Sequence, residues 1–435
     1  MSDIRELSDR LWKGELDTVF EHHPVTSPYN DRRAEELAPG ILYLKGTAGV
    51  TTLDTGDGLV MLDTGGRRES EVVYNQVRAW RPDDRLAAAV FSHHHVDHVY
   101  GVDAFDREAR ERGFGAPVVY GHEAIPYHFE RYRRTSGWNN AINRRQLMPA
   151  AEVAESRAFR WGQPTRLPDV TYRDRVSFGQ GELSFELTHT RGETEDATWT
   201  WVPQRRLLAT GDLFIWAVPN AGNPQKVQRW IGEWAAGLRQ MAALGAELLV
   251  PGHGLPIFGE DRINVALKDT AAFLESIEGQ VVDLMNRGAS LDTVLHTVEI
   301  SDEWLTKPYL RPVYDHPEFL IRNVWRLYGG WYDGEPDHLL PAPRAQEARE
   351  WVSLAGGIEK VLDRAEALVQ AGDARLASHL IEHAVTAEPA NQRAHGLRTR
   401  IYETRAGEQT SQMARNIFRF AAASSRIGKR DDLWD

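Results

Sequence analysis

A short apolar segment that runs directly into a histidine-rich loop is the feature that most constrains this chain. The segment "LAAAVF" covers residues 86–91, and "HHHVDH" follows at 93–98. A run of six apolar residues bounded by polar ones is typical of a strand buried inside a sheet. Four imidazoles and a carboxylate must then lie where that buried strand ends. The sequence therefore favours an α/β fold with a polar site at the strand ends.

The rest of the chain divides into two regions that differ in their pattern of apolar residues. Strand and helix patterns alternate up to about residue 265, and helical spacing dominates afterwards. Strands are predicted at 41–46, 49–66 (with a turn at 54–58), 86–92, 117–122, 175–190 (a hairpin), 198–203, 205–212 and 247–254, and helices at 69–80, 228–244, 263–288, 347–373 and 374–389. A chain of 435 residues is too long for one ordinary core. We expect a catalytic domain over 1–265 and an all-α domain over 266–435. Residues 367–397 also resemble a single tetratricopeptide-like helix pair.

Composition excludes several classes of protein and site. The chain has no cysteine, which excludes disulfides, thiolate catalysis and cysteine-based zinc sites. The formal net charge of −12 argues against a nucleic-acid partner, which requires a basic surface. No apolar run is long enough to span a membrane. The charged N-terminal sequence shows no secretory signal, so we expect a cytoplasmic protein.

The spacing of the polar residues after the first buried strand predicts metal binding. Residues two apart on a strand face the same side, so His93 and His95 can bind one ion. Where the chain turns, Asp97 and His98 can bind a second. Imidazole and carboxylate are ligands that zinc and similar divalent ions accept. An exposed polar loop is the alternative interpretation, and four donors at this spacing argue against it.

This motif resembles that of the metallo-β-lactamase superfamily, and further landmarks follow in the family's order. "VMLDTGG" (60–66) resembles the segment whose aspartate, here Asp63, supports the metal site from behind. "LLATGDLF" (207–214) resembles the strand whose aspartate, here Asp212, bridges two metals, and "LLVPGHG" (248–254) carries the last ligand, His253. The resemblance implies an αββα sandwich holding two divalent ions.

The third ligand position departs from the usual pattern of the superfamily. The loop before residues 198–203 usually carries a histidine, and Glu193 stands there when the sequences are aligned on the glycine. A glutamate at this position marks the alkylsulfatase-like branch. Glu195 and His189 are the alternative ligands. The resemblance thus implies seven metal ligands: His93, His95, Asp97, His98, Glu193, Asp212 and His253.

The C-terminal half resembles the alkylsulfatase dimerisation domain. The matching segments are "HPEFLIRNVWRLYGGWYDGEPDHLLP" (316–341) and residues 351–394. This resemblance implies a homodimer. Well-known alkylsulfatases carry a further sterol-carrier-like domain, which we expect this chain to lack. They also have a glutamate where Asp212 stands here.

Together these residues predict a hydrolase of a small-molecule ester. Two ions can share a water and present it as a bridging hydroxide, with Asp97 and Asp212 as the catalytic carboxylates. We expect zinc, with manganese or iron as alternatives because the ligand set is rich in carboxylates. The branch implies cleavage of an alkyl sulfate to alcohol and sulfate. A lactone, carboxylic ester or phosphate ester is the first alternative, and a non-catalytic binding scaffold is the second.

Binding of a sulfate group requires cationic or polar donors near the metals. The segment 128–147 is rich in arginine, and alkylsulfatases have a comparable insertion that ends in Arg-Arg, here Arg144 and Arg145. Asn223 and Lys226 follow the strand of the bridging aspartate. We therefore expect these four residues to contact substrate, although a solvated helix face is an equally valid interpretation of any single arginine.

Overall fold

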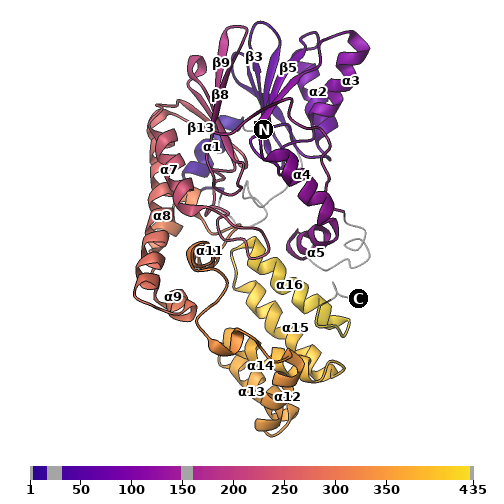
Figure 1. The fold of residues 1–435 in the computed structure, drawn as a ribbon, viewed down its shortest axis with the longest axis vertical. Helices are drawn as coiled ribbons and strands as arrows, with labels where there is room; N and C mark the ends of the chain where they lie inside the picture. The colour runs from indigo at the N-terminus through magenta and orange to yellow at the C-terminus, as the bar shows by residue number, and fades with distance from the viewer. Residues whose placement is uncertain (1–2, 17–31, 148–159, 432–435) are drawn as a thin grey trace. The chain divides into compact units, whose positions relative to one another are not determined.

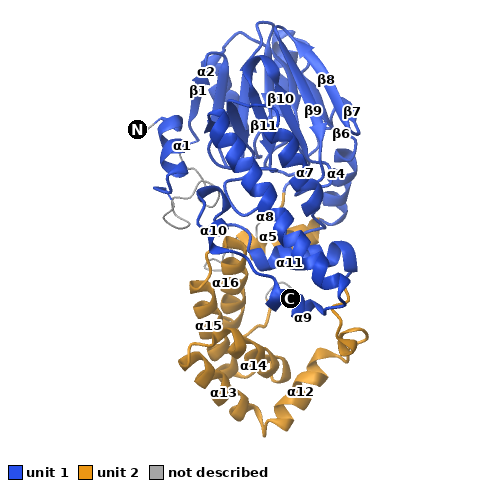
Figure 2. Ribbon diagram, turned by 90° about the vertical axis from the view of Figure 1, so that its left-hand side faces the viewer, with its two compact units in different colours: residues 1–135, 162–330 blue, residues 136–161, 331–435 orange. Residues whose placement is uncertain are grey.

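The computed structural model describes residues 3–16, 32–147 and 160–431, and the chain forms two compact units (Figure 2). The first unit contains residues 1–135 and 162–330, and the second contains 136–161 and 331–435. The second unit is therefore assembled from two segments that lie far apart in the sequence.

Two sheets form the centre of the first unit. The seven-stranded sheet has its strands in sequential order, antiparallel from β1 to β4 and parallel from β4 to β7. Its strands are β1 Ala34–Ala38, β2 Ile41–Lys45, β3 Gly49–Asp54, β4 Leu59–Leu62, β5 Leu86–Val90, β6 Val118–His122 and β7 Val170–Tyr172. The six-stranded sheet has the order β13-β12-β11-β10-β9-β8, and only β11 and β12 are parallel. Its strands are β8 Arg175–Gln180, β9 Leu183–His189, β10 Thr198–Val202, β11 Leu207–Gly211, β12 Leu248–Pro251 and β13 Ile257–Phe258.

The two sheets pack face to face, with helices on both outer faces (Figure 1). Along β2, Ile41 and Tyr43 belong to the core shared with the second sheet, and Leu42 and Leu44 belong to a separate core beneath helices. The helices on that side are α2 Ser70–Trp80, α3 Val102–Arg112 and α4 Ile125–Arg134. The helices α7 Ile231–Ala242 and α8 Glu260–Asn286 cover the other sheet. The predicted αββα sandwich is confirmed, because strands buried on both faces need helices outside them.

Four further helices of this unit follow or precede the sandwich: α1 Ile4–Trp12, α9 Leu291–Thr297, α10 Asp302–Leu305 and α11 Pro317–Gly329. The helix α11 packs against α8 and α9. The strand predictions for β2 to β6 and β8 to β12 are confirmed. The strands β1, β7 and β13 were not predicted, because β1 has no fully buried residue and β7 and β13 have only three and two residues.

The second unit is entirely helical in the residues that the structure describes. Its helices are α5 Ser136–Leu147, α12 Arg344–Leu354, α13 Ile358–Gln370, α14 Ala374–Ala387, α15 Gln392–Gly407 and α16 Gln412–Arg426. Consecutive helices from α13 to α16 pack on one another, and α5 packs on α16. The amide of Asn416 donates a hydrogen bond of 2.8 Å to the carbonyl of Gln146, which joins the two segments. The helical character predicted for the C-terminal region is thus confirmed.

The two compact units do not have the same boundaries as the catalytic and dimerisation domains expected from the sequence. The helices α8 to α11 belong to the first compact unit, and α5 belongs to the second. The predicted boundary between a catalytic domain and a dimerisation domain at residue 265 stays a prediction. Across residues 3–16, 32–147 and 160–431, no helix has both the length and the apolar character needed to cross a membrane.

A close approach of two backbone segments holds the histidine-rich loop against the sheet. The amide of Thr64 donates to the carbonyl of His98 at 2.8 Å, and the amide of Gly101 donates to the Thr64 hydroxyl at 3.1 Å. A Cβ atom on Gly101 would overlap the Thr64 carbonyl oxygen. Residue 101 must therefore be glycine for the loop to lie this close.

We expect Gly101→Ala to destabilise the protein by about 1–3 kcal/mol, because the added methyl group must push the loop away from Thr64. Urea unfolding measures this loss. Gly115→Ala is the matched control, since a Cβ at Gly115 meets no atom within 4 Å. Equal stability of the two variants would contradict the prediction.

Candidate metal centre

The loop after β5 presents its histidines at the end of a fully buried strand. His93 and His98 are 1% and 0% exposed. Asp63, which follows β4, accepts hydrogen bonds of 2.8 Å from both the amide and the hydroxyl of Ser92. The same carboxylate contacts Nδ1 of His98 at 2.8 Å. Asp63 therefore fixes the loop and one of its imidazoles from behind, as the resemblance implied.

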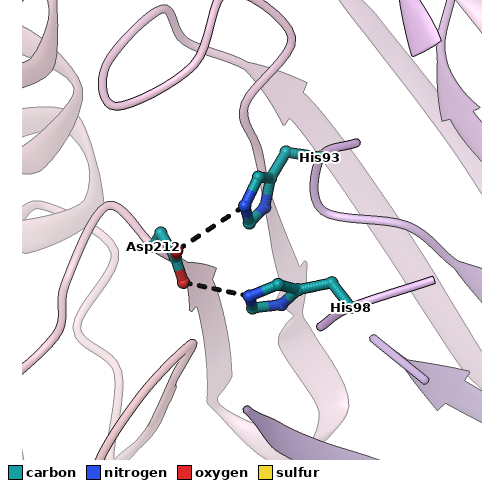
Figure 3. A group of neighbouring side chains, drawn as sticks. All are labelled: His93, His98 and Asp212. Carbon is teal, nitrogen blue, oxygen red and sulfur yellow. Dashed lines mark ion pairs between the residues drawn. The ribbon is translucent and has the colours of Figure 1, made fainter. Parts of the chain in front are cut away.

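Residues from the second sheet meet this loop. Asp212 directly follows β11, Glu193 lies in the loop after β9, and His253 lies in the loop after β12. The Oδ2 atom of Asp212 lies 3.6 Å from Nε2 of His93 and 3.4 Å from Nε2 of His253. Its Oδ1 atom lies 3.3 Å from Nε2 of His98. The carboxylate of Asp212 thus lies between histidines of both sheets, and Figure 3 shows it facing His93 and His98.

The other three predicted ligands lie around this carboxylate. Nδ1 of His95 is 3.9 Å from Oε1 of Glu193 and 3.9 Å from Oδ2 of Asp212. Oδ2 of Asp97 is 3.9 Å from Nε2 of His98 and 3.5 Å from Nε2 of His253. Two groups result that could each hold an ion: His95, Glu193 and Asp212, and Asp97, His98 and His253. His93 joins Asp212 and His98 in a third grouping.

The contacts of the imidazoles fit metal ligation. Nδ1 of His93 contacts the Ser92 hydroxyl at 2.9 Å, and Nδ1 of His253 contacts the Thr47 carbonyl at 2.6 Å. In metal sites the nitrogen that does not bind metal usually donates to such a partner. The opposite nitrogens of His93 and His98 are buried and have no hydrogen-bond partner among the described residues. Buried polar atoms without partners are costly, so these nitrogens need a ligand.

The distances also suit a shared ion better than hydrogen bonds. Values of 3.3–3.9 Å between nitrogen and oxygen are long for a hydrogen bond. Two ligands that each lie about 2.0–2.2 Å from a tetrahedral ion are separated by roughly 3.4 Å. The residues therefore fit a pair of divalent cations, which the fold family implies.

The electrostatics of the site show how strongly its charges interact. Burial lowers the pKa of His93 and His95 well below the usual value, so both imidazoles are neutral and able to bind metal. Burial would also lower the pKa of His253, but Asp212 and Asp97 raise it to about 9. Burial and the neighbouring Asp212 raise the pKa of Glu193. A bound cation would favour neutral His253 and ionised Glu193, so metal binding must release protons here.

The three alternatives for the third ligand occupy different places. Glu193 is 3% exposed and lies beside His95 and Asp212. The side chain of Glu195 is half exposed, and its carboxylate lies 3.7 Å from Nε2 of His128. His189 contacts the carbonyl of Ala197 at 2.9 Å and stacks on His122. The geometry therefore favours Glu193, and the ligand role itself stays a prediction.

The four predicted substrate contacts belong to different compact units. Asn223 and Lys226 lie in the first unit, in the loop between β11 and α7. Arg144 and Arg145 lie on α5 in the second unit. There Arg145 forms an ion pair of 2.8 Å with Asp431, and both guanidinium groups lie within 6 Å of the Phe420 ring. Their predicted contact with substrate stays untested.

A buried arginine and a buried side-chain amide lie beside the candidate ligand Glu193. Arg229 is 2% exposed, and its Nη2 lies 3.5 Å from Oε1 of Glu193. The amide of Asn220 donates to the same oxygen, and the Asn220 carbonyl accepts from Nε of Arg229 at 3.3 Å. Arg229 could not be identified from the sequence, because no local pattern distinguishes it from a surface arginine.

Comparison with known proteins agrees with this geometry. Residues 46–253 match the metallo-beta-lactamase superfamily, and residues 290–428 match the alkyl sulfatase dimerisation family. The chain thus contains a metallo-β-lactamase superfamily domain and an alkylsulfatase dimerisation domain, the combination that marks the alkylsulfatase-like branch. Together the two matches account for most of the alkylsulfatase-like chain.

Individual relatives are similar over most of the chain. A linear primary-alkylsulfatase of Pseudomonas sp. is 26% identical over 368 residues, which are 80% of this chain and 69% of that protein. An (R)-specific secondary-alkylsulfatase of Pseudomonas sp. is 26% identical over 90% of this chain and 62% of that protein. The structure of the inverting sec-alkylsulfatase Pisa1 from Pseudomonas sp. superimposes with a TM-score of 0.79 at 25% identity, covering 91% of this chain and 66% of that one. The alkylsulfatase-like chain thus spans about two thirds of the length of these relatives.

We expect Asp212→Ala to reduce the metal content from about two ions per chain to one or none, because this carboxylate faces ligands of both groups. Elemental analysis after dialysis against metal-free buffer measures the ratio. Asp337→Ala, at a side chain that is 83% exposed, is the control. Unchanged metal content in Asp212→Ala would contradict the shared position of this carboxylate.

Proposed function

We propose that this chain is a dinuclear metal-dependent hydrolase that cleaves an alkyl sulfate ester to an alcohol and sulfate. The convergence of six other candidate nitrogen and oxygen ligands around Asp212 is the observation that supports it best. The relatives named alkylsulfatases supply the substrate class. A non-catalytic scaffold would have no need for this buried ligand set.

Bound divalent ions at this site would supply Lewis acidity and lower the pKa of water to near neutrality. The chain's own residues supply the rest of the chemistry. Asp212, 6% exposed, is held between histidines of both sheets, where it can contact both ion positions. Asp97 has a side chain that is 29% exposed, so it stands where water and substrate arrive and can accept a proton from the attacking water.

Positive charge beside the ligands favours an anionic substrate. Arg229 is buried next to Glu193. Burial, and then the neighbouring Arg229, lower the pKa of Lys226 to about 7, while Glu193 and Asp97 oppose this shift. Arg131 contributes to the same positive field. A sulfate group that binds here would pair its negative charge with these cations. Charge-assisted hydrogen bonds from them to the sulfate oxygens would be strong.

The nature of the ions follows from the donor set. Imidazole nitrogens and carboxylate oxygens suit zinc, and the carboxylates Asp97, Glu193 and Asp212 also suit manganese or iron. We propose zinc as the first choice. Reconstitution with each metal separately would identify the ion that supports activity.

We expect the zinc-loaded protein to release inorganic sulfate from a medium-chain alkyl sulfate, measured by ion chromatography. Lys226→Met should raise KM for the sulfate ester by about tenfold, because one charge-assisted contact contributes about 1.4 kcal/mol or more. KM for a neutral ester of the same alcohol should change little.

Asp97→Ala serves as the control for contaminating enzymes. It should lose activity and keep its far-UV circular dichroism spectrum, because Asp97 lies at the edge of the site and outside the core. Cleavage of lactone, carboxylic or phosphate esters without sulfate release would replace the proposed substrate class. Absence of bound metal after native purification would favour a binding scaffold.

We propose in addition that the chain forms a homodimer through its helical region. Residues 290–428 match the dimerisation family. Within the second unit, Trp331, Leu340 and Leu354 are 70%, 92% and 79% exposed. Large apolar side chains at such exposure are enriched in interfaces.

We expect Leu340→Lys to weaken the dimer, because a lysine would have to lose its hydration in the contact. Sedimentation equilibrium at several concentrations measures the dissociation constant. Val265→Lys, on α8 at 46% exposure, is the control for an added surface charge. Identical association of both variants with the wild type would place the contact elsewhere.

A further inference from the structure

One histidine of the cluster points away from the metal centre. His94 lies between two predicted ligands, His93 and His95, and is 2% exposed. Its ring stacks on His128 of α4, with centroids 4.1 Å apart, and lies 5.3 Å from the ring of Tyr132. The neighbouring candidate ligands His93 and His95 instead lie beside Asp212.

Both ring nitrogens of His94 have partners. Nδ1 lies 2.8 Å from Oδ1 of Asp196, and Nε2 lies 3.0 Å from Nη2 of Arg131. A guanidinium group can only donate, so Nε2 must accept and the proton must be on Nδ1. His94 therefore donates to Asp196 in a single fixed tautomer. The Arg131 cation thus donates to the neutral ring of His94, which in turn donates to the Asp196 anion.

This contact joins the two ligand loops. His94 belongs to the loop after β5 of the seven-stranded sheet, and Asp196 belongs to the loop after β9 of the other sheet, three residues beyond Glu193. Asp196 is 0% exposed. A second link lies beside it, because the amide of Thr198 donates to the carbonyl of Ser92 at 2.8 Å. The ligands His93 and His95 are thus tied to Glu193 through buried hydrogen bonds.

A third metal ion is the competing interpretation of this cluster. His94, His128 and Asp196 lie close enough to hold one, and both ring nitrogens of His128 are buried without a hydrogen-bond partner among the described residues. Arg131 argues against it. An ion on Nδ1 of His94 would place the proton on Nε2, where it would face the guanidinium donor. The ion would also add positive charge beside Arg131.

We infer that the hydrogen bond between His94 and Asp196, held in one tautomer by Arg131, positions the metal ligands His93, His95 and Glu193. These residues are positioning residues and do not touch metal or substrate in this role. The inference rests on the proposed metal centre. Contacts of this kind orient ligands, and their loss typically weakens metal binding about 10- to 100-fold.

The test compares D196A with D196N. The amide oxygen of D196N can still accept from His94, whereas D196A leaves the buried Nδ1–H without a partner. Zinc affinity of the folded protein is measured by competition with a chromophoric chelator. We expect the weaker of the two dissociation constants to rise about 10- to 100-fold in D196A and to stay near the wild-type value in D196N. Thermal unfolding of the metal-free proteins is measured in parallel.

Several outcomes would overturn the inference. If D196A lowers the thermal midpoint without changing zinc affinity, the pair serves stability alone. Three zinc ions per chain in the wild type, with one lost in His128→Ala, would identify a third metal site instead. If D196A does not fold, Arg131→Met supplies the test, since it removes the donor that fixes the tautomer and should also weaken zinc binding. A wild type that binds no metal would refute the metal centre itself.

Discussion

The buried carboxylate of Asp212 is the interaction on which the arrangement of the site depends. An anion that is 6% exposed is stable only when positive charge surrounds it. Burial would raise its pKa, but His253 and His98 lower it well below the usual range. These histidines come from both sheets, so the carboxylate can be neutralised only when the sandwich has closed. Folding and assembly of the metal centre are therefore linked.

The sandwich architecture explains why the ligands can be so scattered in sequence. The ligand loops after β5, β11 and β12 follow strands that are buried on both faces or nearly so, and these strands belong to two packed sheets. Rigid strands fix where each loop begins, and short contacts such as Asp63 with Ser92 fix how it turns. Loops positioned in this way can hold metal ligands in a precise geometry, because the strands and these contacts restrict the conformations that the loops can adopt.

The sequence predicted the features that are encoded locally. Buried strands are visible as apolar runs, and the ligands of the loop at 93–98 are visible because their spacing is regular. Arg229 and Asp196 could not be found in this way, because their roles come from neighbours distant in sequence. The packing of α5 on α16 is equally hidden, since it joins Gln146 to Asn416 over 270 positions. The sequence alone suggests that Arg144 and Arg145 contact substrate, and only the structure shows that they pack beside Phe420.

The glutamate at position 193 has a physical consequence that a histidine would not have. It places a second buried carboxylate near Asp212, and burial, together with repulsion between the two carboxylates, raises the pKa of Glu193. Arg229 and Asn220 both contact the same oxygen of Glu193, which compensates part of this added charge. The ligand exchange and the buried arginine therefore belong together: a neutral histidine at 193 would leave Arg229 buried without its anionic partner. Positive charge for an anionic ester would therefore have to come from other cations of the same cluster, Lys226 and Arg131.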